Sequence, residues 1–334
     1  MSGEDRYETI GVAGAGAFGT ALALAAARAG RRVLLWARDE ATVASLREHR
    51  EAPRLPGARL PEAIEPVADV AALRPVEALI LAVPTQALGS VCALLAPALP
   101  HGLPAISAAK GIEQGSRRFT TQIIAEALPQ AVPAVLSGPS FAADIAHGLP
   151  TALTLACADG GLARMLAEAL NSSTLRLYHS DDPRGVEIGG AAKNVLAIAA
   201  GIAIGLRLGE SARAALVARG FAELRRFGEA HGARPETLMG LSGLGDVVLS
   251  CATTQSRNFA YGEALGRGKT PAEAAGGKLA EGAFTASVLV EMARARAIEM
   301  PIAEAVAAVI AGTAGVRDVV AELLARPVRA EHRT

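Results

Sequence analysis

The spacing of apolar positions changes near residue 180 of this 334-residue chain. Before that point, short apolar runs alternate with segments of helical spacing, a pattern typical of parallel strands covered by helices on both faces. The expected strands are residues 8–13, 32–37, 76–83, 104–107, 132–136, 151–157 and 174–178. After Tyr178 the pattern is helical to the end. We therefore expect an α/β fold in which a doubly wound sheet, residues 1–182, precedes an all-α domain, residues 183–334.

One segment of the strand-rich half lacks regular spacing. Four prolines punctuate it, namely Pro53, Pro56, Pro61 and Pro66. Because proline lacks the amide donor that a sheet uses, we expect residues 51–66 to form an irregular excursion before the sheet resumes.

A glycine-rich turn directly follows the first expected strand. It reads Gly14-Ala-Gly16-Ala-Phe-Gly19, and the helical segment after it ends at Gly30. Between a strand and a helix, Gly14 permits a tight turn, Gly16 lets the backbone approach a pyrophosphate, and Gly19 lets the helix pack on the strand. An ordinary glycine turn is the alternative. The context favours a dinucleotide site, which makes the expected sheet one of the Rossmann type.

The residue that selects between dinucleotides is expected at the end of the second strand. An acidic residue there would bind the ribose hydroxyls of NAD, whereas this chain has Arg38 followed by Asp39. Arg38 is well placed to hold the 2′-phosphate of NADP, and a solvated charge at a strand end is the alternative. Asp39 is more simply the cap of a helix over residues 40–49.

A long apolar stretch runs from Gly185 to Leu206, with Lys193 as its single cationic residue. The run from Val195 to Leu206 carries no charge and is shorter than the roughly 20 residues needed to span a bilayer, so it predicts a core helix buried on all sides. Burial disfavours an ammonium ion, so a lysine in this position is suited to proton transfer. The alternative is a lysine whose flexible stem carries its charge out to water.

Composition limits the partners. Lys plus Arg number 33 and Asp plus Glu number 33, so no global charge favours nucleic acid or an anionic membrane. Cys92, Cys157 and Cys251 lie far apart, and neither they nor the 6 histidines have the spacing of metal ligands. We expect reduced thiols and no metal. The first residues show no apolar run after a basic start, which predicts a cytoplasmic chain without a secretory signal or stable membrane insertion.

Two polar loops of the second half offer groups that bind anions. Residues 240–246 place Asp246 after a glycine run, and residues 255–258 set Arg257 beside Asn258, a combination suited to phosphate. Each loop alone is more often a simple turn. The nearby run 262–270 resembles a phosphate-binding P-loop, but five residues rather than four separate its glycines, so we expect Thr270 to cap a helix instead.

Together these motifs resemble those of the bacterial NAD(P)-dependent sn-glycerol-3-phosphate dehydrogenases along nearly the whole chain. The matching stretches are Gly-Ala-Gly-Ala-Phe-Gly-Thr-Ala-Leu-Ala, Ala-Lys110-Gly, Ser-Gly138-Pro-Ser-Phe-Ala, Gly-Gly-Ala-Ala-Lys193-Asn, Gly-Leu-Gly-Asp246 and Gln-Ser-Arg257-Asn258. The chain departs from many relatives at Ala17-Phe18, where they have Ser-Tyr, and at Ser140, which replaces a common threonine. The resemblance implies interconversion of dihydroxyacetone phosphate and sn-glycerol 3-phosphate with NADP(H) or NAD(H), in support of glycerophospholipid synthesis. It also implies a homodimer.

The resemblance further implies residue roles, with Lys193 and Asp246 in catalysis and Lys193 as the proton donor and acceptor. The implied substrate-binding residues are Lys110, Gly138, Ser140, Lys193, Asp246, Ser256, Arg257 and Asn258. The implied cofactor-binding residues, with the three glycines of the turn, are Gly14, Gly16, Ala17, Phe18, Gly19, Arg38, Lys110, Ala142, Arg257, Leu279 and Glu281. A buried lysine could supply a proton and stabilise the alkoxide that forms on reduction, and Asp246 could orient it.

Two other functions share part of this pattern. A dehydrogenase of hydroxyacids or sugar acids would have the same glycine turn, a helical second domain and even a catalytic lysine. A redox-sensing NAD(P)-binding protein would need neither Lys193 nor Asp246. Arg257 and Asn258 favour a phosphate-bearing substrate. The sequence leaves open the preference between NADP and NAD, the physiological direction, feedback regulation and the oligomeric state.

Overall fold

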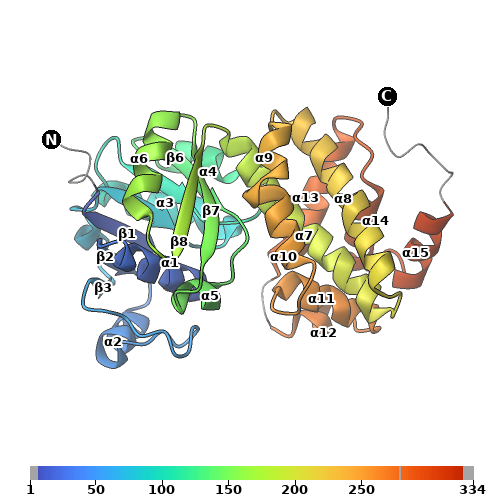
Figure 1. The fold of residues 1–334 in the computed structure, drawn as a ribbon, viewed down its shortest axis with the longest axis horizontal. Helices are drawn as coiled ribbons and strands as arrows, with labels where there is room; N and C mark the ends of the chain where they lie inside the picture. Colours follow the sequence, from blue (N-terminus) through green and yellow to red (C-terminus); the bar gives the residue numbers. More distant parts are fainter. Residues whose placement is uncertain (1–6, 278–279, 326–334) are drawn as a thin grey trace. The chain divides into compact units, whose positions relative to one another are not determined.

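The structure is a computed structural model that describes residues 7–277 and 280–325. The described chain forms two compact units (Figure 1). The first comprises residues up to Ala191 together with Gly228–Leu249, and the second comprises Ala192–Phe227 together with residues from Ser250 onward. The chain therefore enters the helical unit, returns once to the first unit, and enters the helical unit again.

An eight-stranded sheet in the order β3-β2-β1-β4-β5-β6-β7-β8 forms the centre of the first unit. Its strands are β1 (Thr9–Ala13), β2 (Arg32–Trp36), β3 (Ile64–Val67), β4 (Ala78–Leu81), β5 (Pro104–Ser107), β6 (Val132–Ser137), β7 (Thr151–Cys157) and β8 (Leu175–Ser180). Neighbouring strands are parallel except for β6 and β7, which pair antiparallel. The strand order reverses between β1 and β4, and ligands of such sheets bind outside the carboxyl ends of the strands at this point.

Helices cover both faces of this sheet, as the apolar runs of its strands require. They are α1 (Ala17–Arg28), α2 (Glu40–His49), α3 (Thr85–Leu95), α4 (Thr120–Ala127), α5 (Ala142–Ala146) and α6 (Gly160–Leu170), with short 3₁₀ turns η2 (Val70–Leu73) and η3 (Ala96–Ala98). Successive residues of β4 alternate between two cores. Ile80 packs in the core that contains α1, α5 and α6, and Leu79 and Leu81 pack in the core that contains α3 and α4. This confirms the Rossmann-type doubly wound sheet.

The second unit is entirely helical within the residues that the structure describes. The helices after the sheet are α7 (Pro183–Gly205), α8 (Glu210–Ala230), α9 (Pro235–Met239), α10 (Asp246–Ser250), α11 (Arg257–Gly266), α12 (Pro271–Ala275), α13 (Glu281–Arg294), α14 (Pro301–Ile310) and α15 (Val316–Leu324), with one π-turn η4 (Leu241–Gly245) before α10. The first part of α7 up to Ala191, the end of α8, all of α9 and η4, and α10 up to Leu249 belong to the first unit. As expected, Thr270 caps α12, because its hydroxyl accepts from Glu273 N and the Glu273 carboxylate accepts from Thr270 N.

The predicted strands are confirmed, but the irregular excursion over residues 51–66 is wrong at its end. Ile64–Val67 forms β3, with Pro66 opposite Leu35 in the parallel register with β2. Since β3 is at the edge of the sheet, Pro66 needs no amide donor toward a second neighbour. A proline, which lacks an amide donor, is thus compatible with a strand when that strand is at the edge of the sheet.

The predicted core helix is confirmed as α7, but it is longer than the apolar run indicated. It begins at Pro183, includes Arg184 and Glu187, and has 23 residues. In the described part of the chain it is the one helix long and apolar enough to cross a membrane, and 94% of its apolar window is buried. This burial is that of a core helix.

Candidate active site

The glycine turn between β1 and α1 has the geometry that a dinucleotide requires. Gly14 has φ +114°, and a Cβ there would lie 2.5 Å from the carbonyl oxygen of Ala82. A Cβ on Gly19 would overlap the carbonyl oxygen of Gly14, so α1 can pack on β1 only with glycine at this position. A Cβ on Gly16 would meet nothing within 4 Å.

Gly16 is therefore the glycine that the protein's own packing does not require. It is the N-cap of α1 and offers no side chain to the amides of the first turn, which has no acidic residue. Free amides and the positive end of a helix dipole bind an anion, and the space beside Gly16 admits one. The residues present thus fit the pyrophosphate of a dinucleotide.

The end of β2 separates the roles of two adjacent charged residues. Asp39 caps α2 by accepting from Ala41 N at 3.3 Å, from Thr42 N at 3.1 Å and from the Thr42 hydroxyl at 2.6 Å. The hydrogen bonds from Thr42, and that from Ala41 N, lower the pKa of Asp39. The predicted cap is confirmed. Arg38 is exposed directly before it, and its contact with a 2′-phosphate stays a prediction.

Lys110 lies close to three other predicted substrate residues of the first unit. Its Nζ donates to the Asp246 carboxylate at 2.6 Å and to the carbonyl oxygen of Gly138 at 2.9 Å, and the side chains of Lys110 and Asp246 are 12% and 1% exposed. The Ser140 hydroxyl donates to the same carbonyl at 3.3 Å. The Lys110 ammonium also lies 6.0 Å from the centroid of the Phe18 ring, next to the glycine turn.

Backbone constraints place each partner of Lys110. Gly138 has φ +147°, and a Cβ there would lie 3.1 Å from Leu153 Cα on the neighbouring strand. Asp246 follows the π-turn η4, in which a Cβ on Gly243 would overlap the Leu238 carbonyl oxygen. The glycines of the polar loop at residues 240–246 therefore allow the tight π-turn that directs Asp246 inward. Ala142 is the first residue of α5, directly after the strand-end loop that holds Gly138.

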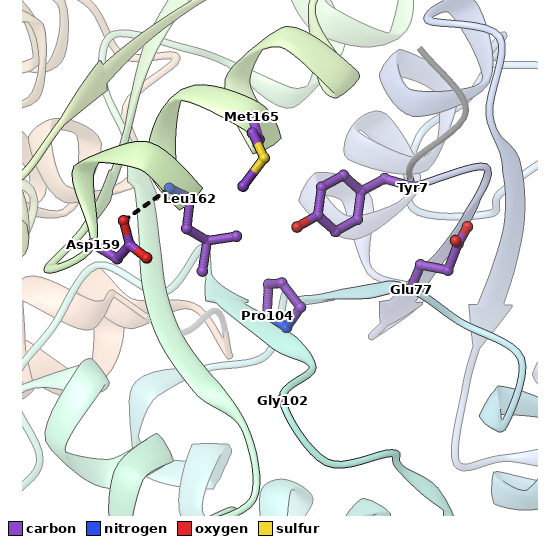
Figure 2. Close-up of a pocket in the computed structure, with 7 residues that line it drawn as sticks. All are labelled: Tyr7, Glu77, Gly102, Pro104, Asp159, Leu162 and Met165. Carbon is purple, nitrogen blue, oxygen red and sulfur yellow. Dashed lines mark hydrogen bonds between the residues drawn. The ribbon is translucent and has the colours of Figure 1, made fainter. Parts of the chain in front are cut away.

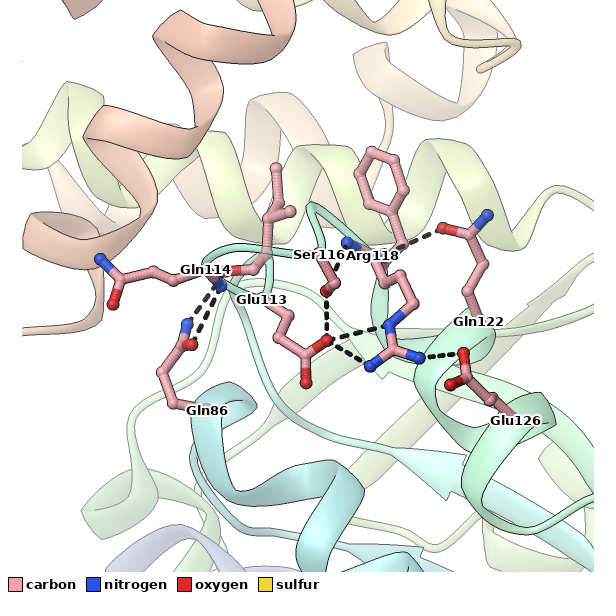
Figure 3. A network of polar contacts seen from close by, with 9 residues as sticks. Gln86, Glu113, Gln114, Ser116, Arg118, Gln122 and Glu126 are labelled. Carbon is pink, nitrogen blue, oxygen red and sulfur yellow. Dashed lines mark hydrogen bonds and ion pairs between the residues drawn. The ribbon is translucent and has the colours of Figure 1, made fainter.

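A network of polar contacts holds the loop that carries Lys110 (Figure 3). The Gln86 amide donates to Ile112 O at 3.0 Å and accepts from Gln114 N at 3.0 Å. Arg118 donates to Glu113 at 2.7 and 2.9 Å and also contacts Glu126. Burial raises the pKa of Glu113, but hydrogen bonds from Ser116 and Arg118 outweigh it and hold that pKa below the usual range. The loop is thus held by charged hydrogen bonds of Arg118 and by the neutral amide of Gln86 on α3.

Lys193 lies in the second unit and is 8% exposed. Its Nζ donates to the Ser250 hydroxyl at 2.6 Å. The sequence prediction missed Ser250, although a signal existed, since Ser250 stands four residues after Asp246 and therefore on the same face of a helix. The prediction that Lys193 is buried rather than solvated is confirmed.

Two hydrogen bonds of its side-chain amide hold the predicted residue Asn258 in place in the second unit. Its Nδ2 donates to Asn194 Oδ1 at 2.8 Å, and its Oδ1 accepts from Gly282 N at 3.0 Å. Asn258 thereby joins α7, α11 and the start of α13, where Glu281 is the first helical residue. The prediction named neither Asn194 nor Gly282. Their signal was weak, because an amide side chain next to a lysine has many ordinary uses.

The other predicted residues of this unit lie nearby in the chain. The Ser256 hydroxyl caps α11 by accepting from Phe259 N at 3.4 Å, and Arg257 is the exposed first residue of that helix. Leu279 lies outside the described residues. Among the residues that the structure describes, no group of three or more His, Cys, Asp or Glu side chains lies together as metal ligands would. Cys92, Cys157 and Cys251 are buried, and burial raises the pKa of Cys92 to about 12.

A separate hollow of about 390 Å³ lies at the amino ends of the strands β1, β4 and β5 (Figure 2). Tyr7, Glu77 and Pro104 line it just before or at the start of β1, β4 and β5, whereas the glycine turn follows the end of β1. The Asp159 carboxylate in its wall accepts from Leu162 N at 3.1 Å as the cap of α6. This hollow contains none of the predicted site residues.

A Rossmann-type sheet with a fitted glycine turn at its switch point, followed by a helical unit with a buried lysine, defines a dinucleotide-dependent oxidoreductase. The match to known families is more specific. The family described as NAD-dependent glycerol-3-phosphate dehydrogenase N-terminus matches residues 9–163, and that described as NAD-dependent glycerol-3-phosphate dehydrogenase C-terminus matches residues 182–321. The chain belongs to the NAD-dependent glycerol-3-phosphate dehydrogenase family.

Individual relatives agree over nearly the full length. The glycerol-3-phosphate dehydrogenase (NAD(P)+) of Azorhizobium caulinodans is 60% identical over 327 residues, which cover 97% of this chain and 99% of that one. The enzyme of the same description from Rhodopseudomonas palustris strain HaA2 is 57% identical over 325 residues, with 97% and 99% covered. The crystal structure of glycerol-3-phosphate dehydrogenase from Coxiella burnetii is similar with a TM-score of 0.90 at 39% identity, covering 96% of this chain and 99% of that chain.

Proposed function

We propose how the residues described above carry out the family reaction. The chain is an oxidoreductase of the glycerol-3-phosphate dehydrogenase family, which interconverts dihydroxyacetone phosphate and sn-glycerol 3-phosphate with NAD(P)H. Supply of glycerol 3-phosphate for glycerophospholipid synthesis is the usual role of this reaction. Reduction adds a hydride to the carbonyl carbon and a proton to the oxygen, so the protein must orient the carbonyl and deliver the proton.

The first unit would bind the cofactor, which supplies the hydride when bound. Gly14, Gly16 and Gly19 would admit its pyrophosphate to the amino end of α1, with Ala17 and Phe18 in the first turn. Arg38 would hold the 2′-phosphate of NADP, whereas NAD would lack this contact. The remaining proposed cofactor contacts are Lys110, Ala142, Arg257, Leu279 and Glu281. Gly16 carries this proposal, because neither packing nor a positive φ requires glycine at this position and the open space beside it adjoins the amino end of α1.

Lys193 would act as general acid in reduction and general base in oxidation. It is a buried cation on a helix that is otherwise uncharged from Val195 to its end, and its Nζ is held at 2.6 Å by Ser250. An ammonium in a low-dielectric site stabilises the alkoxide as it forms and can give it a proton. Asp246 would assist catalysis as an acceptor that orients the cations of the site.

The substrate would be held by charged and amide groups that orient its carbonyl. Arg257 offers a planar guanidinium for bidentate contact with the phosphate, and Asn258 and Ser256 add neutral donors. Lys110, Gly138 and Ser140 would bind the rest of the three-carbon chain. The proposed functional domains, residues 1–182 for the dinucleotide and residues 183–334 for substrate and catalysis, would then both be required. We further propose a cytoplasmic homodimer without stable membrane insertion or nucleic-acid partner.

The test is NADH or NADPH absorbance on addition of dihydroxyacetone phosphate, for the wild-type chain and for Lys193→Met. The methionine keeps much of the apolar volume of the stem, so the fold and the NAD(P)H fluorescence titration should survive. Turnover should fall by about two to four orders of magnitude, the range for loss of acid–base catalysis. Oxidation of glycerol 3-phosphate by the wild type should decline on the acid side, and the residual mutant activity should lack that limb.

Two outcomes would contradict this proposal. Wild-type protein that binds NAD(P)H but consumes none with dihydroxyacetone phosphate would refute the activity. A Lys193→Met variant with turnover within a few-fold of wild type and the same acid limb would refute the role of Lys193, and Lys110 would be the next candidate.

A further inference from the structure

One face of α7 in the first unit follows the segment that carries Lys110. Arg184, Glu187 and Gly190 are spaced by three residues and so share a face of the helix. Arg184 and Glu187 contact residues 119–121, and Gly190 lies beside Lys110. We call these three residues the α7 face.

Glu187 makes the strongest of these contacts. It is 5% exposed, and its Oε1 accepts from Thr121 N at 2.6 Å and from the Thr120 hydroxyl at 3.0 Å. These are the first two residues of α4, whose N-cap position is occupied by Phe119, a side chain without an acceptor. Glu187 therefore supplies, from another helix, the oxygen acceptor that the amino end of α4 lacks.

Arg184 explains why the cap position of α4 is aromatic. Its guanidinium lies 3.9 Å from the centroid of the Phe119 ring, a favourable cation–π distance. Its Nη1 is 3.9 Å from Glu187 Oε2, which accepts no hydrogen bond from the described residues. The far end of the Lys110 segment is thus attached to α7 by one stacked cation and one buried carboxylate.

Gly190 supports the near end of the same segment. A Cβ at this position would lie 3.6 Å from Lys110 Cγ and 2.6 Å from the Ser137 hydroxyl oxygen. The bare helix backbone is therefore the surface on which the aliphatic stem of Lys110 rests. The ammonium at the end of that stem is the group that reaches Gly138 and Asp246.

We propose that Glu187 is a positioning residue for substrate binding, acting through Lys110. Glu187 holds Thr120 and Thr121 against α7, and Gly190 of the same helix supports the Lys110 stem. The spacing of Glu187 and Gly190 on α7 therefore sets the distance between the two ends of the loop. The polar network of Gln86, Glu113 and Arg118 holds the middle of that loop but does not attach it to α7. This inference rests on the proposed role of Lys110 in substrate binding.

The test compares Glu187→Ala with a matched variant in the second unit, Glu223→Ala. Glu223 is 3% exposed and caps another helix in the same way, accepting from Ile302 N at 2.9 Å and from Ala303 N at 3.2 Å. Both variants should lower thermal stability, because each leaves buried amides without their acceptor. Glu187→Ala should also raise the KM for dihydroxyacetone phosphate about tenfold and the KM for NAD(P)H, which Lys110 is also proposed to contact, by a smaller factor, and Glu223→Ala should change neither.

Two milder variants keep the proposal testable if Glu187→Ala does not fold. Glu187→Gln retains the oxygen acceptor for Thr121 N and should restore the wild-type KM to within about twofold. Thr120→Val removes the other contact, the hydroxyl that donates to Glu187 Oε1 at 3.0 Å, and should raise the KM for dihydroxyacetone phosphate about threefold. A wild-type KM in both Glu187→Ala and Thr120→Val, or an equal increase in Glu223→Ala, would overturn the proposal.

A double-mutant cycle separates this inference from the proposed function. If Glu187 acts through Lys110, then Glu187→Ala should have no further effect on the KM in a Lys110→Ala background. If Glu187→Ala raises the KM by the same factor in the wild-type and the Lys110→Ala backgrounds, then Glu187 acts by another route. A wild-type KM in Lys110→Ala alone would instead refute the role of Lys110 itself.

Discussion

The surroundings of Lys110 and of Lys193 show two ways to hold a lysine in place. Lys110 is on a loop, and that loop is fixed by hydrogen bonds that Gln86 and Arg118 donate and that Glu113 and Glu187 accept. Lys193 is on a helix, and the helix is fixed mainly by contact of backbone with backbone. A loop has no regular shape of its own and must be defined by directional bonds, whereas a helix needs only a fitted neighbour.

The backbone contact in the second unit comes from two pairs of glycines with the same spacing. Gly201 and Gly205 on α7 face the carbonyl oxygens of Phe259 and Glu263, and a Cβ on either glycine would overlap them. On α11, Gly262 and Gly266 face the carbonyl oxygens of Ile198 and Ile202 in the same way. Small residues four apart on both helices let the axes approach closely. The helix that carries Lys193 is therefore located by steric fit.

The largest effect should come from breaking that fit. In Gly262→Ala the new Cβ would overlap the Ile198 carbonyl, and neither helix backbone can move without repacking the unit. We expect a loss of about 3 kcal/mol in the free energy of unfolding, measured by denaturant titration, since overpacking outweighs the helix propensity of alanine.

The matched control is Gly89→Ala in α3, where the nearest atom to a new Cβ is Ile123 Cγ2 at 3.4 Å. That substitution should be neutral or stabilising by up to about 1 kcal/mol. Equal stability of the two variants would mean that α7 and α11 do not depend on the glycine pairs.

The fold could be predicted from local patterns wherever one short stretch carries the whole signal. The glycine turn, the cap at Asp39 and the cap at Thr270 each lie within a few residues, and the apolar runs predict their strands. The strand β3 escaped prediction because Pro66 is acceptable only at a sheet edge, and edge position is a property of the whole sheet. The glycine pairs on α7 and α11 are informative only once both helices are known to touch.

The site was predictable in its residue types and not in its pairings. Lys110, Asp246 and Lys193 were identified from motifs, but the ion pair of Lys110 with Asp246 joins residues 136 positions apart. Ser250 and Glu187 have no motif of their own. Their roles depend on which side chain or helix end lies opposite, and this is decided by tertiary packing.

A smaller effect should distinguish side-chain from backbone obstruction on α7. A Cβ on Gly190 meets the Ser137 hydroxyl oxygen at 2.6 Å but no other atom closer than 3.5 Å. We expect Gly190→Ala to cost about 2 kcal/mol and the double variant Gly190→Ala, Ser137→Ala to recover most of it, because removing the hydroxyl removes the overlap. Denaturant unfolding of the single and double variants gives the coupling energy.

The neighbouring glycine is the control for this cycle. A Cβ on Gly189 would lie 2.6 Å from the backbone oxygen of Ser242, which no side-chain substitution removes. Gly189→Ala should therefore stay destabilised when combined with Ser242→Ala. Recovery in that pair, or none in the Gly190 pair, would contradict the assignment of the two obstructions.

The smallest effect separates the two regions by pH. Burial raises the pKa of the Glu187 carboxyl, and the hydrogen bond from Thr121 and the charge of Arg184 only partly oppose it. As pH rises through the ordinary glutamate range, near 4.3, the unfolded chain releases its proton while the folded chain keeps it, so rising pH favours unfolding. The stability of the wild type relative to Glu187→Gln should therefore fall as pH increases from about 4 to about 5, by no more than about 1.4 kcal/mol in total for one proton. The comparison is made by denaturant unfolding of both proteins over that range, where other titrating groups cancel.

The stability difference between wild type and Gly262→Ala should stay constant over the same range, because a steric fit binds no proton. A flat difference for Glu187→Gln, or one that rises with pH, would mean that this carboxylate is stabilised in the folded chain and that hydrogen bonds outweigh its burial.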